Sequence, residues 1–184
     1  MDFAWLNIDG SFKEGTSRCG FGGLFRDNKG KWVLGFQGSL SGLSPLHAEL
    51  RALKTGLHLA MEQGSTYLEV ESDSMDVINC LENGNTTLIN IIHECRLLMN
   101  QVRFQTIQHN FIEANKPAHK LAKHAVHVNN CRDLEIMHYP PSFVTDVLSS
   151  DYEGSIYLAK NISKDASTKL ASFGNKNVMR DISI

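Results

Sequence analysis

The N-terminal part of the chain contains three aromatic and branched segments in close succession, and this run constrains the fold more than any other feature. The segments read FAWLNIDGSF, GFGGLFRDNKG and KWVLGFQGSL, and the turn-forming residues Asp27, Asn28 and Gly30 join the last two. Aromatic and branched side chains favour β-strands, and short connections favour pairing between neighbouring strands. The sequence therefore predicts an antiparallel meander of three strands.

A long amphipathic segment follows these strands. Between Pro45, which suits a first helical turn, and Gly64, which suits a helix end, leucines recur at helical spacing. The remaining predicted elements are a strand in TYLEVESDS, a helix from Asp73 or Ser74 to about Gly84, a helix from about Leu88 to Gln101, a strand in RFQTIQHNF and a helix from about Asn115 to Asn129. This order, βββαβααβα, predicts an α/β domain in which helices flank a mixed five-stranded sheet.

Length and pattern indicate one domain followed by a tail. The chain has 184 residues, of which 42% are hydrophobic, so it is long enough for one core and short for two full domains. The periodic pattern decays after Cys131, where two prolines interrupt HYPPSFVTDVLSSDYEG, and residues 155–184 are polar. We therefore expect one domain over residues 1–130 and a partly disordered tail over residues 131–184.

Charge and cysteine content narrow the functional classes. The formal net charge is -2, so contact with a nucleic acid must come from a local site rather than from a global positive field. The four cysteines form no CxxC pair and are expected to be reduced. The N-terminus lacks a signal-peptide pattern, and no window reaches the roughly 18 apolar residues of a membrane span. We expect a soluble, intracellular protein of the nucleus or cytoplasm.

Three acids lie at the ends or starts of predicted elements. Asp9 ends the first strand, Glu49 lies one turn into the long helix, and Asp73 ends the fourth strand. Each has an ordinary structural explanation, as a turn residue, a first-turn acid and an N-cap. Together, however, they can converge at one edge of an open α/β sheet. Converging carboxylates suit Mg²⁺ or Mn²⁺, and two such ions about 4 Å apart are typical of phosphodiester cleavage, so the pattern indicates a nuclease.

Four short runs carry a family resemblance. The runs IDGSF, HAELRAL, LEVESDS and HNFIEANKPAHKLA occur in this order on the matching predicted elements. Over about residues 4–128 they resemble the ribonuclease H family, most closely its plant reverse transcriptase-like members related to non-LTR retrotransposons. The resemblance implies the ribonuclease H-like fold and a metal-dependent endonuclease that cuts the RNA strand of an RNA–DNA hybrid. Asp9, Glu49 and Asp73 would be ligands of two Mg²⁺ or Mn²⁺ ions.

The same resemblance assigns roles to two histidines. The family typically has an aspartate where this chain has His119, which places His119 at the fourth metal-ligand position. An imidazole is a softer, uncharged ligand that suits Mn²⁺ better than Mg²⁺. His109 matches a histidine that assists proton transfer and product release.

Gly10, Ser11 and Asn115 are the substrate contacts that the resemblance implies. Asn115 matches an asparagine near the histidine position, but with Pro117 in the following turn it is equally well explained as a helix N-cap. Both explanations of Asn115 stay open at this point.

Two departures from the family pattern support an alternative function. The sequence LSPLHAE stands where the classical enzymes have an Asn-rich turn, and the path from Asp73 to the last helix is short for a basic protrusion. Together with His119, these departures permit a catalytically degenerate domain that serves as a nucleic-acid-binding or protein-interaction module. His124 and His127 lack a complementary acid or cysteine and indicate a solvated basic face rather than a zinc site.

Overall fold

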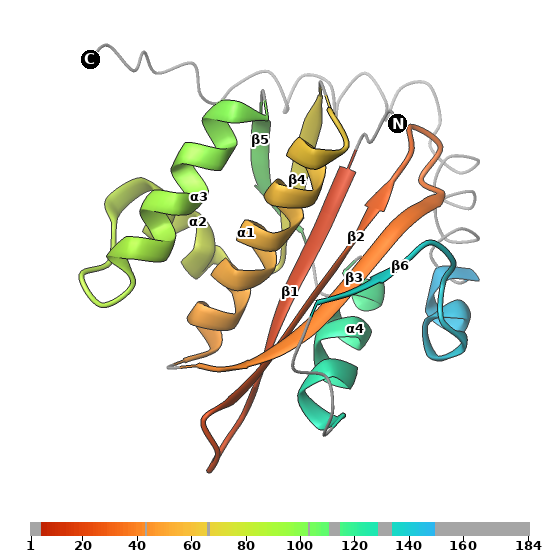
Figure 1. Ribbon diagram of the computed structural model, residues 1–184, viewed down its shortest axis with the longest axis horizontal. Helices are drawn as coiled ribbons and strands as arrows, with labels where there is room; N and C mark the ends of the chain where they lie inside the picture. Colours follow the sequence, from red (N-terminus) through yellow and green to blue (C-terminus); the bar gives the residue numbers. More distant parts are fainter. Residues whose placement is uncertain are drawn as a thin grey trace, which may run out of the picture. The chain divides into compact units, whose positions relative to one another are not determined.

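Three antiparallel strands form the middle of the sheet, as the sequence predicted (Figure 1). They are β1 (Trp5–Lys13), β2 (Arg18–Arg26) and β3 (Trp32–Ser41), and each pairs with the next over nearly its whole length. The structure is a computed structural model, which describes residues 5–42, 44–65, 67–102, 104–110, 115–128 and 134–149. A compact unit extends from Met1 to Leu148.

Three further strands extend this meander on both sides. Strand β4 (Leu68–Ser72) runs parallel to β1, and β5 (Phe104–His109) runs parallel to β4. Strand β6 (Glu135–Met137) pairs antiparallel with β3. The resulting strand order is β5-β4-β1-β2-β3-β6, so β1 lies between an antiparallel and a parallel neighbour.

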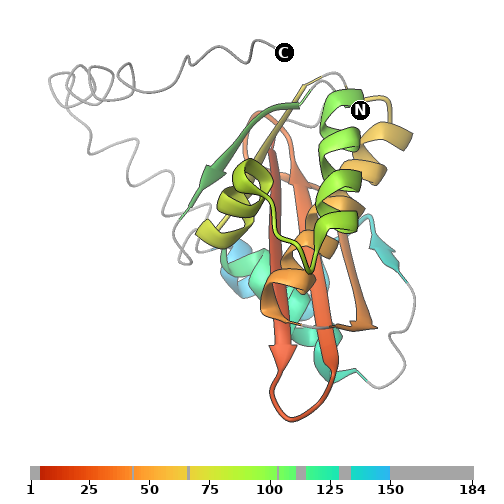
Figure 2. The same cartoon turned by 90° about the vertical axis from the view of Figure 1, so that its left-hand side faces the viewer.

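Helices cover both faces of the sheet (Figures 1 and 2). Helices α1 (Pro45–Glu62), α2 (Met75–Asn83) and α3 (Ile89–Gln101) lie on one face, and α4 (Lys116–His127) lies on the other. Helix α1 begins as predicted, with Pro45 in its first turn and the Ser44 side chain accepting a hydrogen bond from the His47 amide at 3.2 Å. Its end is followed by Gly64, whose φ of 65° is a conformation that glycine adopts easily.

The main core fills the space between the sheet and helices α1 to α3. Its fully buried side chains include Leu6, Ile8, Phe25, Phe36, Leu50, Leu53, Leu57, Val70 and Ile92. On the opposite face α4 packs directly against β2, because a side chain at Gly22 would place its Cβ 2.7 Å from the Ala122 amide nitrogen. The glycine-rich stretch of β2 therefore brings α4 close to the sheet.

The α/β class and the predicted element order are confirmed, but the sheet has six strands where the sequence predicted five. Strand β6 has only three residues, which are exposed or half-buried, so it has no alternation to reveal it. Residues 142–149 also form a helix, and Val144 is fully buried against Leu24, Ala118 and Leu121. Both elements lie in the segment that we assigned to the tail.

Some sequence-based expectations lie outside the described residues. They concern Cys131 and the predicted disorder of residues 155–184. Cys19, Cys80 and Cys95 are free and buried, as expected of reduced cysteines. In the described part of the chain, none of the helices combines the length and apolar composition required to cross a membrane.

Candidate metal-dependent nuclease site

Asp9 lies on β1 and points away from the main core. Side chains alternate along a strand, so Leu6 and Ile8 face α1 while Asn7 and Asp9 face the α4 side. Only 3% of the Asp9 surface is exposed. Burial of a carboxylate at this depth is costly unless a cation or hydrogen-bond donors compensate it.

Glu49 reaches Asp9 because α1 approaches β1 very closely. A Cβ built on Gly10 would lie 2.4 Å from the Glu49 amide nitrogen and 2.7 Å from the Ala48 carbonyl carbon. Any residue other than glycine at position 10 would push the first turns of α1 away from the strand. Gly10, which we expected to contact substrate, thus has a packing role that sets the position of Glu49.

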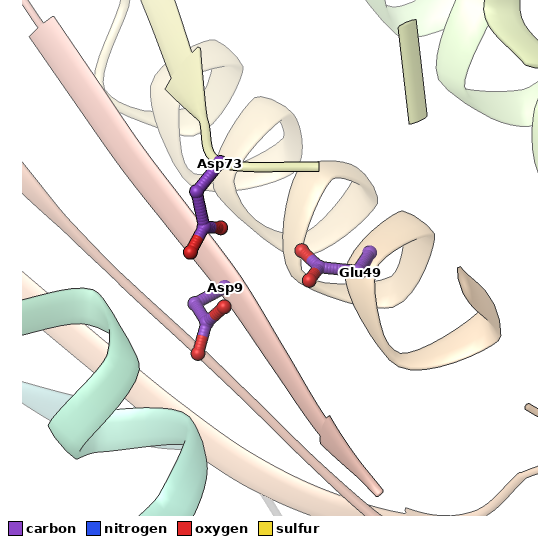
Figure 3. A group of neighbouring side chains, drawn as sticks. All are labelled: Asp9, Glu49 and Asp73. Atoms are coloured by element: carbon purple, nitrogen blue, oxygen red, sulfur yellow. The ribbon is translucent and has the colours of Figure 1, made fainter. Parts of the chain in front are cut away.

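Asp73 follows β4, the parallel neighbour of β1, and completes a group of three acids (Figure 3). One carboxylate oxygen from each of Asp9, Glu49 and Asp73 lies within 4.8 Å of the other two. We call these three residues the acid cluster. The predicted convergence of the three carboxyl groups at one place on the sheet is present in the structure.

The electrostatics of the acid cluster favour a bound cation. Burial raises the pKa of Glu49 well above its usual value, and the nearby Asp9 and Asp73 carboxylates raise it further. Burial likewise raises the pKa of Asp9, although a hydrogen bond with His119 opposes the shift. Among the described residues, Glu49 Oε2 has no hydrogen-bond partner. Closely spaced, buried, hard oxygen atoms with an unpaired acceptor fit a divalent cation such as Mg²⁺ or Mn²⁺.

His119 lies beside the acid cluster, on α4. Its Nδ1 is 3.0 Å from Asp9 Oδ2, and its side chain is 39% exposed. The hydrogen bond with Asp9 raises the pKa of His119, while partial burial lowers it. The structure thus brings the fourth predicted residue to the cluster, in contact with one of the three acids.

Asn115 is fully buried between β1 and Asp73. Its Nδ2 donates hydrogen bonds to the Ile8 carbonyl oxygen at 2.8 Å and to Asp73 Oδ1 at 3.3 Å. The backbone of Asn115 is at the N-cap position of α4, but its side chain makes no capping bond, so the capping explanation is wrong for the side chain. Both Nδ2 partners are acceptors, so the amide orientation is determined, and Oδ1 is left buried without a partner among the described residues.

His109 and Ser11 lie at the margins of the cluster. His109 ends β5, is exposed, and places Nε2 3.2 Å from the Asp73 backbone oxygen. Ser11 is half-buried and shares a face of β1 with Asp9 by strand alternation. The geometry puts both within the neighbourhood of the acids, and their roles remain predictions.

A second polar group, which the sequence analysis missed, borders the acid cluster. Asn7 donates to Glu71 Oε2 at 2.7 Å and accepts from Arg26 Nε at 3.0 Å, and Asn110 donates to the same Glu71 oxygen at 3.0 Å. We call Asn7, Arg26, Glu71 and Asn110 the paired network. The sequence could have indicated this network, because Asn7 and Glu71 precede Asp9 and Asp73 by two residues and so share their side of the sheet.

A cavity of about 370 Å³ opens next to the acid cluster on the α2 side. Its lining comprises Glu49, Asp73, Ser74, Met75 and Asp76. The cluster is therefore reachable by a ligand from solvent, although Asp9 and Glu49 are buried and Asp73 is half-buried.

The comparison with protein families identifies the chain. A family model described as reverse transcriptase-like matches residues 7–125, which is more than half of the chain. The chain belongs to the reverse transcriptase-like family. The part of this reverse transcriptase-like domain that matches includes every acid of the cluster together with His109, Asn115 and His119. The family resemblance seen in the sequence motifs is confirmed.

Solved structures share the fold of this reverse transcriptase-like domain. The RNase H1 of the halophilic archaeon Halobacterium salinarum NRC-1 is 22% identical with a TM-score of 0.62, over 66% of this chain and 95% of that chain. LC11-RNase H1 from compost, in complex with an RNA/DNA hybrid, is 20% identical with a TM-score of 0.60, over 66% and 95% of the two chains. At this identity the likeness shows that the chain has the RNase H fold.

A viral enzyme shares the fold over a small part of its length. The foamy viral protease-reverse transcriptase in complex with an RNA/DNA hybrid is 15% identical with a TM-score of 0.58, over 68% of this chain and 20% of that chain. No curated protein sequence matches the chain. These comparisons assign the family and the fold of the chain.

Proposed function

We propose that this reverse transcriptase-like domain is a metal-dependent endonuclease that cleaves the RNA strand of RNA–DNA hybrids. The observation that carries the proposal is the convergence of Asp9, Glu49 and Asp73 within 4.8 Å, from three different elements of an RNase H fold. Structural neighbours bound to RNA/DNA hybrids support the choice of substrate. The unpaired Glu49 oxygen supports a cation at the cluster.

The acid cluster would hold the cation, and His119 would add a ligand next to Asp9. We infer Mg²⁺ or Mn²⁺, and two ions, because the donors are mainly carboxylates and one imidazole. When bound, such ions activate a water molecule and stabilise the leaving oxygen of a phosphodiester. His119 lacks the negative charge of a fourth acid, which favours Mn²⁺ over Mg²⁺.

Residues around the acids position groups and move protons. Asn115 holds Asp73 in place through Nδ2, and its unpaired Oδ1 would accept a hydrogen bond from substrate or water. The exposed imidazole of His109 would take up and release a proton close to Asp73. Ser11 and the backbone at Gly10 would contact the nucleic acid beside the acids.

The proposal is tested with a hybrid whose RNA strand carries a 5′ label. We expect cleavage of the RNA strand in Mn²⁺ and more slowly in Mg²⁺, with single-stranded RNA and duplex DNA left intact. Hydrolysis by water leaves no 2′,3′-cyclic phosphate, so this end group would reveal a contaminating nuclease that uses the 2′-hydroxyl. The absence of hybrid cleavage in both metals by the full chain would refute the proposal.

A second candidate function is a non-catalytic nucleic-acid-binding or protein-interaction module. The observation that favours it is His119, whose Nδ1 is bonded to Asp9 at 3.0 Å in place of a fourth acid. Calorimetric titration separates the candidates, because a nuclease of this kind must bind Mg²⁺ or Mn²⁺ at the acid cluster. Hybrid binding without metal binding or cleavage would support the module.

A further inference from the structure

One side of helix α4 is entirely basic, and on this side only His119 has a part in the proposed chemistry. The helix contains six basic residues and no acid. They lie at positions 116, 119, 120, 123, 124 and 127, a spacing that places them along one side of a helix. The apolar residues of α4 lie on the other side and pack against the sheet.

The basic side of α4 begins at the acid cluster. His119 contacts Asp9, and the charge of Lys123 is close enough to lower the pKa of His119. The helix ends at His127. The carbonyl oxygen of the next residue, Val128, accepts a hydrogen bond at 3.1 Å from the side chain of Arg18, the first residue of β2. Eleven residue steps of 1.5 Å give a length of roughly 17 Å, which equals the axial rise of about five base pairs of a duplex.

Several of these charges are available to a ligand. Lys116, Lys123 and His127 are exposed, and within the described ranges neither lysine makes an ion pair. Lys120 is half-buried and is paired with Asp146 at 2.7 Å. The helix dipole disfavours a lysine in the first helical turn, so Lys116 does not stabilise α4 through its charge.

We propose that the side of α4 formed by the exposed Lys116, Lys123 and His127 binds the phosphate backbone of the nucleic acid strand that extends from the acid cluster. The positive charge of this side complements a phosphate backbone, and the side adjoins the acid cluster through His119. The proposal rests on the proposed function. In a chain with a net charge of -2, this side supplies the local positive field that a polyanion requires. It would take the place of the basic protrusion for which the sequence leaves little room.

The test measures hybrid affinity against salt concentration, by fluorescence anisotropy of a labelled hybrid with the full chain. The buffer contains a chelator, so that no strand is cut, and its pH is the same for every variant. The test variant carries Lys116→Gln and Lys123→Gln. A matched control carries Lys29→Gln and Lys31→Gln, two exposed lysines in the turn between β2 and β3.

The slope of log affinity against log salt is expected to decrease in magnitude by about 1.8 in the test variant, since each lost duplex-phosphate contact removes about 0.9. The control and a Lys116→Arg, Lys123→Arg variant should keep the wild-type slope. The proposal is overturned if the Gln variant, folded by circular dichroism, keeps the wild-type slope, or if the wild-type chain does not bind the hybrid.

Cleavage measured in parallel separates this proposal from the proposed function. If the wild-type chain cleaves the hybrid and the Gln variant keeps the wild-type slope, only the proposed role of α4 is refuted. If the Gln variant has a reduced slope but none of the proteins cleaves the hybrid, α4 is supported as a binding surface and the proposed nuclease activity is refuted.

Discussion

Two polar groups, the paired network and the acid cluster, both include residues of β1, and they differ in how completely their atoms are paired. In the paired network, Asn7 is 1% exposed, and hydrogen bonds link its amide to Glu71 and Arg26. In the acid cluster, Asp9 is 3% exposed, and Glu49 Oε2 has no partner within the described part of the chain. The depth of burial is similar, so the difference lies in pairing.

The difference indicates which group serves stability and which serves function. A buried polar group that is fully hydrogen-bonded can stabilise a fold, whereas a buried group without a partner destabilises it. We therefore expect the acid cluster, rather than the paired network, to bind a ligand. Breaking the paired network should lower stability, and neutralising the acid cluster should remove activity without lowering stability.

The largest effect is expected for Asp73→Asn. Hybrid cleavage should fall by more than roughly 100-fold. Mutating a residue that only hydrogen-bonds to a metal ligand already lowers metal affinity or activity by about 10- to 100-fold, and Asp73 is a proposed ligand itself. Without metal, the free energy of unfolding should stay equal or increase, because carboxylate repulsion is relieved. Gel assays and urea titration in a chelator measure the two quantities.

The matched control for Asp73→Asn is Glu82→Gln, which neutralises an exposed acid on α2. It should cleave like the wild-type chain. An equal loss of cleavage in both variants would show a general effect of charge. Retained cleavage in Asp73→Asn would show that Asp73 is not a metal ligand.

The second effect concerns the paired network. Asn7→Ala leaves Glu71 and Arg26 without a shared partner and should lower the free energy of unfolding by about 1–3 kcal/mol. Asn100→Ala, at an exposed position on α3, should change it by less than about 0.5 kcal/mol. Chemical denaturation measures both, and equal values would show that the network contributes nothing to stability.

A third prediction converts His119 into the acid typical of the family. His119→Asp should raise Mg²⁺-dependent cleavage by about tenfold, since it adds a charged hard ligand beside Asp9. The activity ratio between Mn²⁺ and Mg²⁺ should decrease. His58→Asp adds the same charge at an exposed site on α1 and serves as control. If His119→Asp and His119→Ala both match the wild type, His119 is not a ligand.

The smallest effect is the pH dependence of stability without metal. The pKa of Glu49 is raised in the folded state, so the folded chain binds this proton more tightly than the unfolded chain. The resulting stabilisation is present at pH values below about 4.3, the unfolded value, and is lost as pH rises through the folded pKa. Denaturation in a chelator should show wild-type stability falling relative to Glu49→Gln over this range. Parallel curves for the two proteins would contradict the prediction.

Local patterns in the sequence determined the element types and their order. The strand meander, the leucine spacing of α1 and the positions of Asp9, Glu49 and Asp73 could all be predicted, because alternation, helical periodicity and turn chemistry depend on neighbouring residues. The family motifs added His109 and His119, which the structure places beside the acids.

Non-local contacts decided the rest. Strand β6 forms because β3 offers a free edge, the contact between Gly10 and α1 brings Glu49 to Asp9, and Asn115 holds Asp73 instead of capping α4. Each contact joins residues far apart in the chain, so no local periodicity in the sequence predicts it. By itself the sequence determined which side chains are candidates for the chemistry, and the tertiary structure decided which of their atoms meet, because hydrogen bonding and desolvation depend on distances that only packing sets.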